Sequence, residues 1–404
     1  MFSRIAGLAF VGAASVASAP ASAGAYGSVY SFNGGTDGSA PLSGLLKVGG
    51  KLYGTTVFGG TGNCHLIGFS GCGTVFKFDP NTGAETIVHS FTGSDGFQPS
   101  ATLIDVRGIL YGTTGFGGTC GCGTVFGLSP KTGALTVIHS FQPGGDDGTY
   151  PFASLTNVGG MLYGTTQYGG ATNNGTVFSI DLSTGAEKVV YSFQGGSDGA
   201  YSIAGLTKYK NVLYGTTLRG GTMDNGTVFA LDPASGAESV VYSLQGGNDG
   251  AHPYAGVINV GGKLFGATRH GGGQGCDGSG CGVVFSVNPA TGNETIVHTF
   301  AGPDGATPLG SLVHVRGTLY GTTISGGLSL TSSTNGTIYS IDPATGAETV
   351  LHSFGNPGDG RQPRTTLVDV NGTLYGTTSC GGTAGTATSC AGSPGYGTVF
   401  SFTP

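Results

Sequence analysis

The few charged side chains of this sequence recur at fixed places, and the most regular of them are aspartates. An Asp-Gly pair occurs once in each of seven similar segments, at Asp37, Asp95, Asp147, Asp198, Asp249, Asp304 and Asp359. Seven carboxylates on one face of a ring would offer hard oxygen ligands to Ca²⁺, the one cofactor that the pattern suggests. The alternative is that each Asp caps its own tight turn. We favour this alternative, because a binding site seldom needs every copy of a repeat, and expect no required cofactor.

A second set of polar residues interrupts the repeat. Around the fifth segment, charged and imidazole side chains stand in same-face loops where other copies carry small or apolar residues, at Arg219, Asp249, His252, Arg269 and His270. Arg and His together can bind a carboxylate or sulfate of a polysaccharide, or serve as charge neutraliser and base in a lyase. The alternative is sequence drift on a solvated loop.

A third set shares one position on the innermost strands of consecutive segments, at Lys47, Asp105, His314 and Asp369. These residues could line the lower mouth of a central channel. The alternative is that they are solvated polar residues beside a hairpin.

Complete catalytic sets are hard to find in this sequence. All five glutamates follow the Asp-Pro-x-Thr-Gly type of turn, which places them on the opposite face, so a two-carboxylate glycosidase would need Asp alone. No Ser/His/Asp order or nucleophile elbow stands out. Four histidines occupy the outer-strand position that Tyr30, Tyr191 and Tyr242 hold elsewhere, which indicates a structural role: His89, His139, His298 and His352. We therefore expect binding rather than catalysis.

The eight cysteines all fall in loops between the second and third strands of a segment. They form four local pairs, Cys64/Cys72, Cys120/Cys122, Cys276/Cys281 and Cys380/Cys390. In an exported protein such pairs predict four disulfides that pin single loops. The Cys120/Cys122 pair would be strained, with redox lability as its alternative role. A zinc site lacks a second pair at suitable spacing.

These residues are positioned by an internal repeat. Leu-Tyr-Gly-Thr-Thr begins at Leu52 and recurs to Leu374, with Leu-Phe-Gly-Ala-Thr at Leu264, and each copy is followed by Gly-Thr-Val-Phe or a variant. In the third unit we expect strands over 153–158, 161–166, 176–181 and 188–193, separated by Gly-bearing turns. Four-stranded units of about 50 residues are propeller blades.

The ends of the chain complement one another. Residues 26–32 match a fourth strand, and the chain stops after a third strand, so the two fragments complete one blade and leave no open edge. We predict an all-β, seven-bladed β-propeller of four-stranded antiparallel blades over residues 24–404. The blades would span about 42–91, 101–141, 153–193, 204–244, 255–300, 310–354 and 365–402.

The repeated strings also carry a resemblance. Leu-Tyr-Gly-Thr-Thr-x-x-Gly-Gly followed by Gly-Thr-Val-Phe resembles the Gloeo-Verruco (GloVer) tandem repeat of exported bacterial proteins, and more distantly kelch blades. The resemblance covers nearly the whole chain after residue 23 and implies an exported bacterial surface or extracellular protein. It brings no catalytic residues with it. This sequence lacks the C-terminal sorting tail of anchored members.

Composition limits the partners. With 15 Lys+Arg and a net charge of −6, the chain is poorly suited to neutralise nucleic-acid phosphates. Residues 1–23 have the cationic start, apolar run and small-residue cleavage site of a signal peptide, and no membrane span is expected. We expect a secreted monomer that binds a polysaccharide or surface protein without catalysis. The alternatives are a carbohydrate-active lyase or hydrolase, and a purely structural envelope component.

Overall fold

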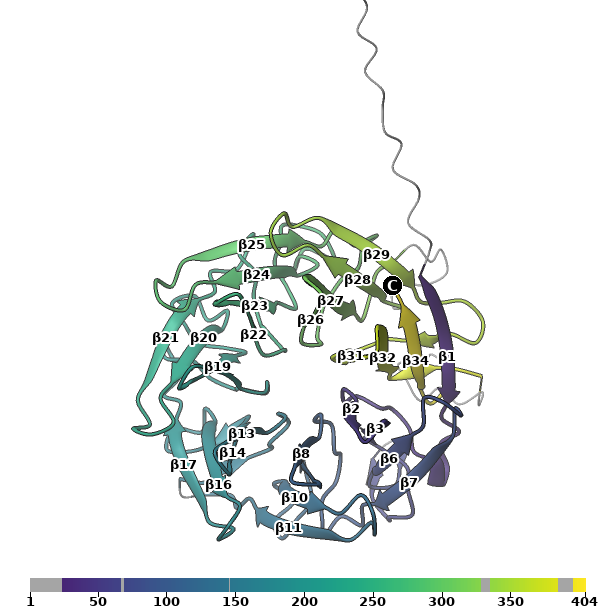
Figure 1. Ribbon diagram of the computed structural model, residues 1–404. Helices are drawn as coiled ribbons and strands as arrows, with labels where there is room; N and C mark the ends of the chain where they lie inside the picture. Colours follow the sequence, from purple (N-terminus) through teal and green to yellow (C-terminus); the bar gives the residue numbers. More distant parts are fainter. Residues whose placement is uncertain (1–23, 67–68, 145, 328–334, 384–394) are drawn as a thin grey trace, which may run out of the picture.

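Seven similar sheets surround a central axis in this protein. A computed structural model describes residues 24–66, 69–144, 146–327, 335–383 and 395–404. The predicted signal peptide therefore lies outside the described residues. The strands form seven four-stranded antiparallel sheets arranged as a β-propeller, which confirms the predicted fold (Figure 1). The described chain has no α-helix, only a 3₁₀ turn, η1 (Gly35–Asp37).

Each blade contributes one strand to each of four concentric layers. The innermost strands are β2 (Leu46–Val48), β8 (Ile104–Val106), β13 (Thr156–Val158), β18 (Thr207–Tyr209), β22 (Ile258–Val260), β26 (Val313–Val315) and β31 (Val368–Val370). The second strands are β3 (Lys51–Thr56), β9 (Ile109–Thr114), β14 (Met161–Thr166), β19 (Val212–Thr217), β23 (Lys263–Ala267), β27 (Thr318–Thr323) and β32 (Thr373–Thr378). The third strands are β6 (Thr74–Phe78), β10 (Thr124–Leu128), β16 (Thr176–Asp181), β20 (Thr227–Leu231), β24 (Val283–Val287), β28 (Thr337–Ile341) and β34 (Thr398–Thr403). The outer strands are β7 (Glu85–Ser90), β11 (Leu135–Ser140), β17 (Glu187–Ser192), β21 (Glu238–Ser243), β25 (Glu294–Thr299), β29 (Glu348–Ser353) and β1 (Ala25–Ser31).

The first strand of the chain closes the ring, as predicted. β1 pairs with β34 over Ala25↔Thr403 to Ser31↔Thr398 and becomes the outer strand of the seventh blade. Both ends of the described chain are thereby held in one sheet. In Figure 1 the outer strands follow one another around the circumference, so the end of each lies beside the start of the next. We call each such junction a seam.

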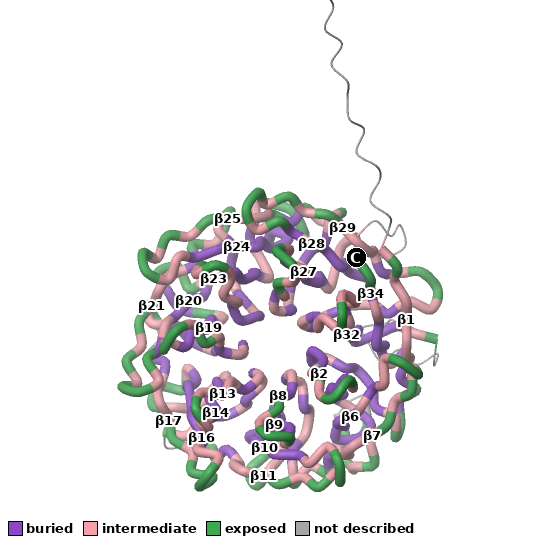
Figure 2. Tube along the Cα trace, viewed as in Figure 1, coloured by how far each residue is buried: buried purple, intermediate pink, exposed green. Residues whose placement is uncertain are grey.

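The hydrophobic core lies between the blades and explains two of the repeated strings. Buried residues form clusters that join one blade to the next, whereas exposed residues follow the turns at the outer edge (Figure 2). The aromatic residue that follows an outer strand meets the Phe of Gly-Thr-Val-Phe in the next blade, as with Phe193 and Phe229, whose ring centroids are 5.2 Å apart at 73°. Such edge-to-face contacts suit the quadrupoles of two aromatic rings.

The Gly of Leu-Tyr-Gly-Thr-Thr makes room for that Phe. A Cβ atom on Gly215 would lie 2.5 Å from Cζ of Phe229 and 2.8 Å from Cδ2 of Leu206. A larger residue here would push the second strand away from the packed ring. The Thr at the end of the same string is also buried, and Oγ1 of Thr217 lies 2.8 Å from Oγ1 of Thr227 on the third strand.

The strand boundaries differ slightly from the prediction in the third unit. The innermost strand begins at Thr156 rather than residue 153, because residues 153 and 154 line the central channel before the sheet starts. Three further two-stranded ribbons lie in the loops: β4 (His65–Leu66) with β5 (Phe69–Ser70), β12 (Gly148–Thr149) with β15 (Tyr168–Gly169), and β30 (Gly360–Arg361) with β33 (Cys380–Gly381).

Candidate functional site

Two sets of loops pair with one another on a single face, which we call the loop-rich face. The loop entering each blade bridges to the loop between its second and third strands, for instance Ala200 to Arg219 and Ala251 to His270. The same pairing is made by β12 with β15 and by β30 with β33. It recurs in all seven blades and brings the loop that carries the Asp-Gly pair against the loop between the second and third strands. Loops on such a rigid scaffold are where binding residues usually lie.

The chain then turns inward at a residue with a left-handed backbone in every blade. The residue is never glycine, and its φ lies between 53° and 61°, at Ala40, Gln98, Tyr150, Tyr201, His252, Thr307 and Gln362. Side chains with a Cβ adopt this conformation only at a cost. Two positions later, one residue from each blade lines the mouth of the central channel: Leu42, Ser100, Phe152, Ile203, Tyr254, Leu309 and Arg364.

Four of the five residues predicted around the fifth segment lie together on the loop-rich face. The rings of His252 and His270 meet edge to face with centroids 5.6 Å apart. The N–H of Arg269 donates to the carbonyl of His252 at 3.1 Å. Arg219, in the neighbouring blade, is exposed and pairs with Asp224 at 3.2 Å. Asp249 lies apart from this group, at a seam described below.

The two histidines favour the neutral form. Burial lowers the pKa of His252, and the Arg219 guanidinium lowers it further. Burial and the adjacent Arg269 lower the pKa of His270. At neutral pH the positive charge of this region therefore comes from its arginines.

Sequence reasoning missed Arg364, a further arginine at the mouth of the channel. Nη1 of Arg269 lies 3.0 Å from the hydroxyl oxygen of Tyr254, and its guanidinium lies 5.2 Å from the Tyr254 ring centroid. Tyr254 and Arg364 line the same cavity. Comparing the seven copies at this one position would have identified Arg364, because the other six residues there are uncharged.

Aromatic side chains lie along the loop-rich face of the first four blades. They contact one another in a continuous series with ring centroids 5.0 to 6.5 Å apart, and all are partly exposed. We call this series the aromatic band: Phe58, Phe97, Phe116, Tyr150, Tyr168 and Tyr201. Phe116 also contacts Phe152 at 5.8 Å, which connects the band to the channel mouth. None of these six residues was among the predicted site residues, although their equivalent positions in the repeat could have located them.

The residues predicted at the lower channel mouth occupy the middle of four innermost strands. Lys47, Asp105 and His314 are exposed, on β2, β8 and β26, and Asp369 is partly buried on β31. The carboxylates of Asp105 and Asp369 each accept a 2.8 Å hydrogen bond from the N–H of Gly108 or Gly372 in their own hairpin. The two aspartates thus cap turns on the face opposite the aromatic band.

Every aspartate of the Asp-Gly series caps its own loop. In all seven blades its carboxylate accepts a hydrogen bond, of 2.5 to 3.1 Å, from a backbone N–H at the end of the outer strand. The same carboxylate contacts the Tyr or His of that strand, for example Asp249 with Tyr242 at 2.9 Å and Asp304 with His298 at 3.0 Å. The histidines thus have the same partner as the tyrosines they replace.

The glutamates do not lie apart from these aspartates, contrary to expectation. Because the outer strands follow the circumference, the Glu that begins one outer strand reaches the Asp that follows the preceding strand (Figure 1). Burial and Asp37 raise the pKa of Glu85 to about 8, and burial and Asp198 do the same for Glu238. Burial raises the pKa of the other three to about 7, at Glu187, Glu294 and Glu348.

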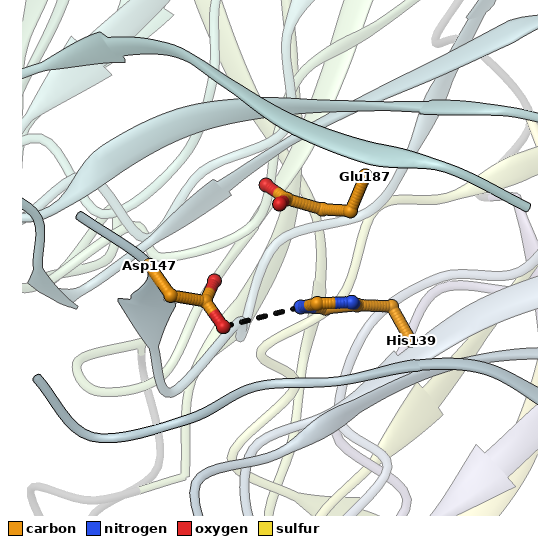
Figure 3. Close-up of side chains that lie close together, drawn as sticks. All are labelled: His139, Asp147 and Glu187. Carbon is orange, nitrogen blue, oxygen red and sulfur yellow. Dashed lines mark hydrogen bonds and ion pairs between the residues drawn. The ribbon is translucent and has the colours of Figure 1, made fainter. Parts of the chain in front are cut away.

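Two seams bring together side chains that could hold a metal ion. Ligand atoms of His139, Asp147 and Glu187 lie within 4.8 Å of one another, and Figure 3 shows the imidazole pointing at Asp147 with Glu187 above it. His298, Asp304 and Glu348 repeat this arrangement. Imidazole with carboxylates suits first-row divalent ions. The described part of the chain contains no other group of three such ligands within this distance.

The cysteine prediction is partly wrong. Cys64–Cys72 and Cys276–Cys281 are disulfides, and Cys380 is disulfide-bonded, whereas its predicted partner Cys390 lies outside the described residues. Cys120 and Cys122 are free thiols, one exposed and one buried. The two residues lie outside the named strands, on either side of Gly121, whose backbone is left-handed with φ 76°. Cys120 is exposed and its thiol donates to Oε1 of Gln142 at 2.7 Å, while Cys122 faces the core.

No helix in the described residues is long and apolar enough to cross a membrane.

Comparison with known proteins places the chain in a repeat family. Its sequence matches the model of the Gloeobacter/Verrucomicrobia repeat over residues 12–217, 62–278 and 159–390. No curated protein matches the sequence. Similar solved structures include a nidogen/laminin complex, with a TM-score of 0.44, 12% identity, and coverage of 70% of this chain and 90% of the other. TolB from Acinetobacter baumannii gives a TM-score of 0.44 and 15% identity over 72% of this chain and 61% of TolB. Since the family matches together span most of the sequence, the chain belongs to the Gloeobacter/Verrucomicrobia repeat family.

Proposed function

We propose that this protein is an exported, non-catalytic binding propeller that holds a polysaccharide on its loop-rich face. The observation that carries the proposal is the aromatic band, in which six partly exposed rings run across neighbouring blades. Contiguous exposed apolar surface on a soluble protein commonly marks a binding site. Tyr and Phe supply large rigid contact areas at low entropic cost.

The chemistry of sugars fits such a surface. A pyranose ring has an apolar face of C–H groups, which can pack against an aromatic ring, while its hydroxyls at the edge remain free to bind polar groups. The polar partners are present along the band, because Tyr150, Tyr168 and Tyr201 carry hydroxyls and the Arg/His group adjoins it in the next blades. An extended polymer can contact several of these rings at once, so weak contacts add up along the chain.

The disulfides support the exported location. Loops of the first and fifth blades are closed by Cys64–Cys72 and Cys276–Cys281. Disulfides form and persist in oxidising compartments. The predicted signal peptide over residues 1–23 and the family membership agree with this location.

The test is size-exclusion chromatography of the protein, lacking residues 1–23, with soluble acidic and neutral polysaccharides, following both components. We expect at least one polymer to co-elute with the protein at unchanged length. Phe116→Ala and Tyr168→Ala should abolish co-elution, whereas Tyr209→Ala, which removes a ring from the opposite face, should not. A polymer that shortens with time would show an enzyme instead. No co-elution of any polymer would favour a protein ligand or a structural role.

A further inference from the structure

One charged side chain enters the central channel from the loop-rich face. The cavity there has a volume of about 120 Å³ and is lined by residues of all seven blades. Its walls are mostly Ser, Thr, Gly and Ala, and no Asp or Glu is found among the described residues that line it. Among the described residues, Arg364 is the only charged one in this lining. Six blades have an uncharged side chain at this position, and the seventh has Arg364. The seventh blade therefore brings a positive charge to the mouth of the channel.

A second arginine approaches the same mouth from the fifth blade. Arg269 lies against Tyr254 through the 3.0 Å contact of Nη1 with the hydroxyl and a stacking distance of 5.2 Å. Tyr254 itself lines the cavity with Arg364. Burial lowers the pKa of the Arg364 guanidinium, and the positive charge of Arg269 lowers it further.

Neither arginine is neutralised by the protein. Among the described residues, no carboxylate forms an ion pair with Arg269 or Arg364, whereas the exposed Arg219 is paired with Asp224. The Nε atoms of Arg269 and Arg364 are both buried and lack a hydrogen-bond partner. Arg364 has one long contact, 3.5 Å from Nη2 to Oε1 of Gln362. Two partly desolvated cations without a counter-charge are costly unless an anion joins them.

We propose that Arg269, Arg364 and Tyr254 bind a carboxylate or sulfate group at the mouth of the channel. This inference rests on the proposed function and narrows it: the ligand is an acidic polysaccharide whose sugar rings lie along the aromatic band and whose charged group enters the mouth. Guanidinium groups bind both oxyanions through paired N–H donors. Phe152 connects the two regions, since it lines the cavity and contacts Phe116 of the band.

The experiment compares polymers that differ only in charge. Polygalacturonate is matched with its methyl ester, and dextran sulfate with dextran, and dissociation constants are measured by calorimetry at low salt. The wild type should bind the acidic member of at least one pair more tightly. Arg364→Gln and Arg269→Gln should each weaken that binding about tenfold, the loss expected for a charge-assisted contact. The two pairs distinguish a carboxylate from a sulfate ligand.

The matched control is Arg107→Gln, which removes an equal charge from an exposed arginine in the hairpin between β8 and β9, on the opposite face. It should change the dissociation constant less than twofold. Arg364→Gln also removes a partly desolvated charge next to Arg269. The melting temperature of this variant should therefore equal or exceed that of the wild type, and a loss of binding would not reflect unfolding.

A small-anion measurement separates this inference from the proposed function. Glucuronate or sulfate should raise the melting temperature of the wild type but not that of Arg364→Gln. If no polymer binds but small anions still act through Arg364, the channel site stands and polysaccharide binding is wrong. If acidic and neutral polymers bind equally, or the Arg269 and Arg364 variants bind as the wild type does, the anion site is wrong while polysaccharide binding stands. If an acidic protein binds instead and sulfate displaces it, the anion site stands and its ligand is a protein rather than a polysaccharide.

Discussion

The ring of Tyr26 stacks on the ring of His352, with centroids 3.8 Å apart and planes 5° from parallel. Tyr26 belongs to β1, the first strand of the chain, and His352 to β29 of the sixth blade. In its sheet Tyr26 faces Phe402, the register position at which Glu85 faces Phe78 in the first blade. The seam that closes the ring therefore has an aromatic stack where five others have a glutamate.

Removing this stack should weaken closure of the ring. We expect Tyr26→Ala to lower the free energy of unfolding by about 2 kcal/mol, less than the cost for a fully buried aromatic ring, because Tyr26 is half-buried. Urea unfolding followed by circular dichroism measures this change. Tyr26→Phe keeps the ring and should remain close to the wild type. Equal midpoints for Tyr26→Ala and the wild type would show that the stack contributes nothing to closure.

The repeated glycine of the second strand should tolerate no methyl group. Gly215→Ala places Cβ 2.5 Å from Phe229, so we expect a loss of about 1–3 kcal/mol by overpacking. Gly27 is also in a strand, but a Cβ there would meet only Oγ of Ser401, at 3.6 Å, so Gly27→Ala is the control and should be near neutral. Adding Phe229→Leu to Gly215→Ala should recover part of the loss, and strict additivity of the two changes would contradict a direct clash.

The fold was predictable because each repeated string has a local structural reason. The glycine makes room for a Phe, the Asp-Gly loop is capped by its own carboxylate, and the separated end strands match one sheet. The contacts between glutamates and aspartates at the seams were not predictable in the same way. Glu238 follows a turn on one face of the propeller. Because the outer strands are tilted, its side chain nevertheless reaches Asp198, and spacing in the sequence does not reveal this contact.

The candidate site was only partly visible for a related reason. Arg219, His252, Arg269 and His270 stand out as departures within one stretch of sequence, and the structure brings them together. Arg364 is far from them in the chain and reaches Tyr254 only because the ring closes. The Cys120/Cys122 prediction was wrong because closeness in sequence does not by itself bring two side chains together: Cys120 is exposed, whereas Cys122 is buried.

The two free thiols should differ in reactivity. Cys120 is exposed, whereas burial raises the pKa of the Cys122 thiol and so lowers its thiolate fraction. Alkylation of the folded protein without reductant, followed by peptide mass spectrometry, should label Cys120 rapidly and Cys122 only after unfolding. Cys64, Cys72, Cys276 and Cys281 should stay unlabelled until they are reduced. Recovery of a Cys120–Cys122 disulfide from freshly purified protein would contradict the free pair.

The Asp–Glu pairs at the seams should make the propeller more stable in mild acid than in base. Glu238 has its pKa raised to about 8 by burial and by Asp198, so the folded protein holds a proton that the unfolded chain releases near the ordinary value of 4.5. The resulting stabilisation is complete below about pH 4.5 and is lost as the pH rises through about 8. The same direction applies to Glu85, whose neighbour is Asp37.

Glu238→Gln tests this dependence, because Gln resembles the protonated acid but cannot ionise. The variant should match the wild type at pH 5 and be more stable at pH 9, by about 1 kcal/mol once solvent screening of the half-exposed carboxyl is allowed for. Asp277→Asn, which neutralises an exposed carboxylate outside the seams, should give no such difference. Urea midpoints at the two pH values measure both variants. A Glu238→Gln curve parallel to that of the wild type across this range would show that the seam glutamate is ionised in the folded protein.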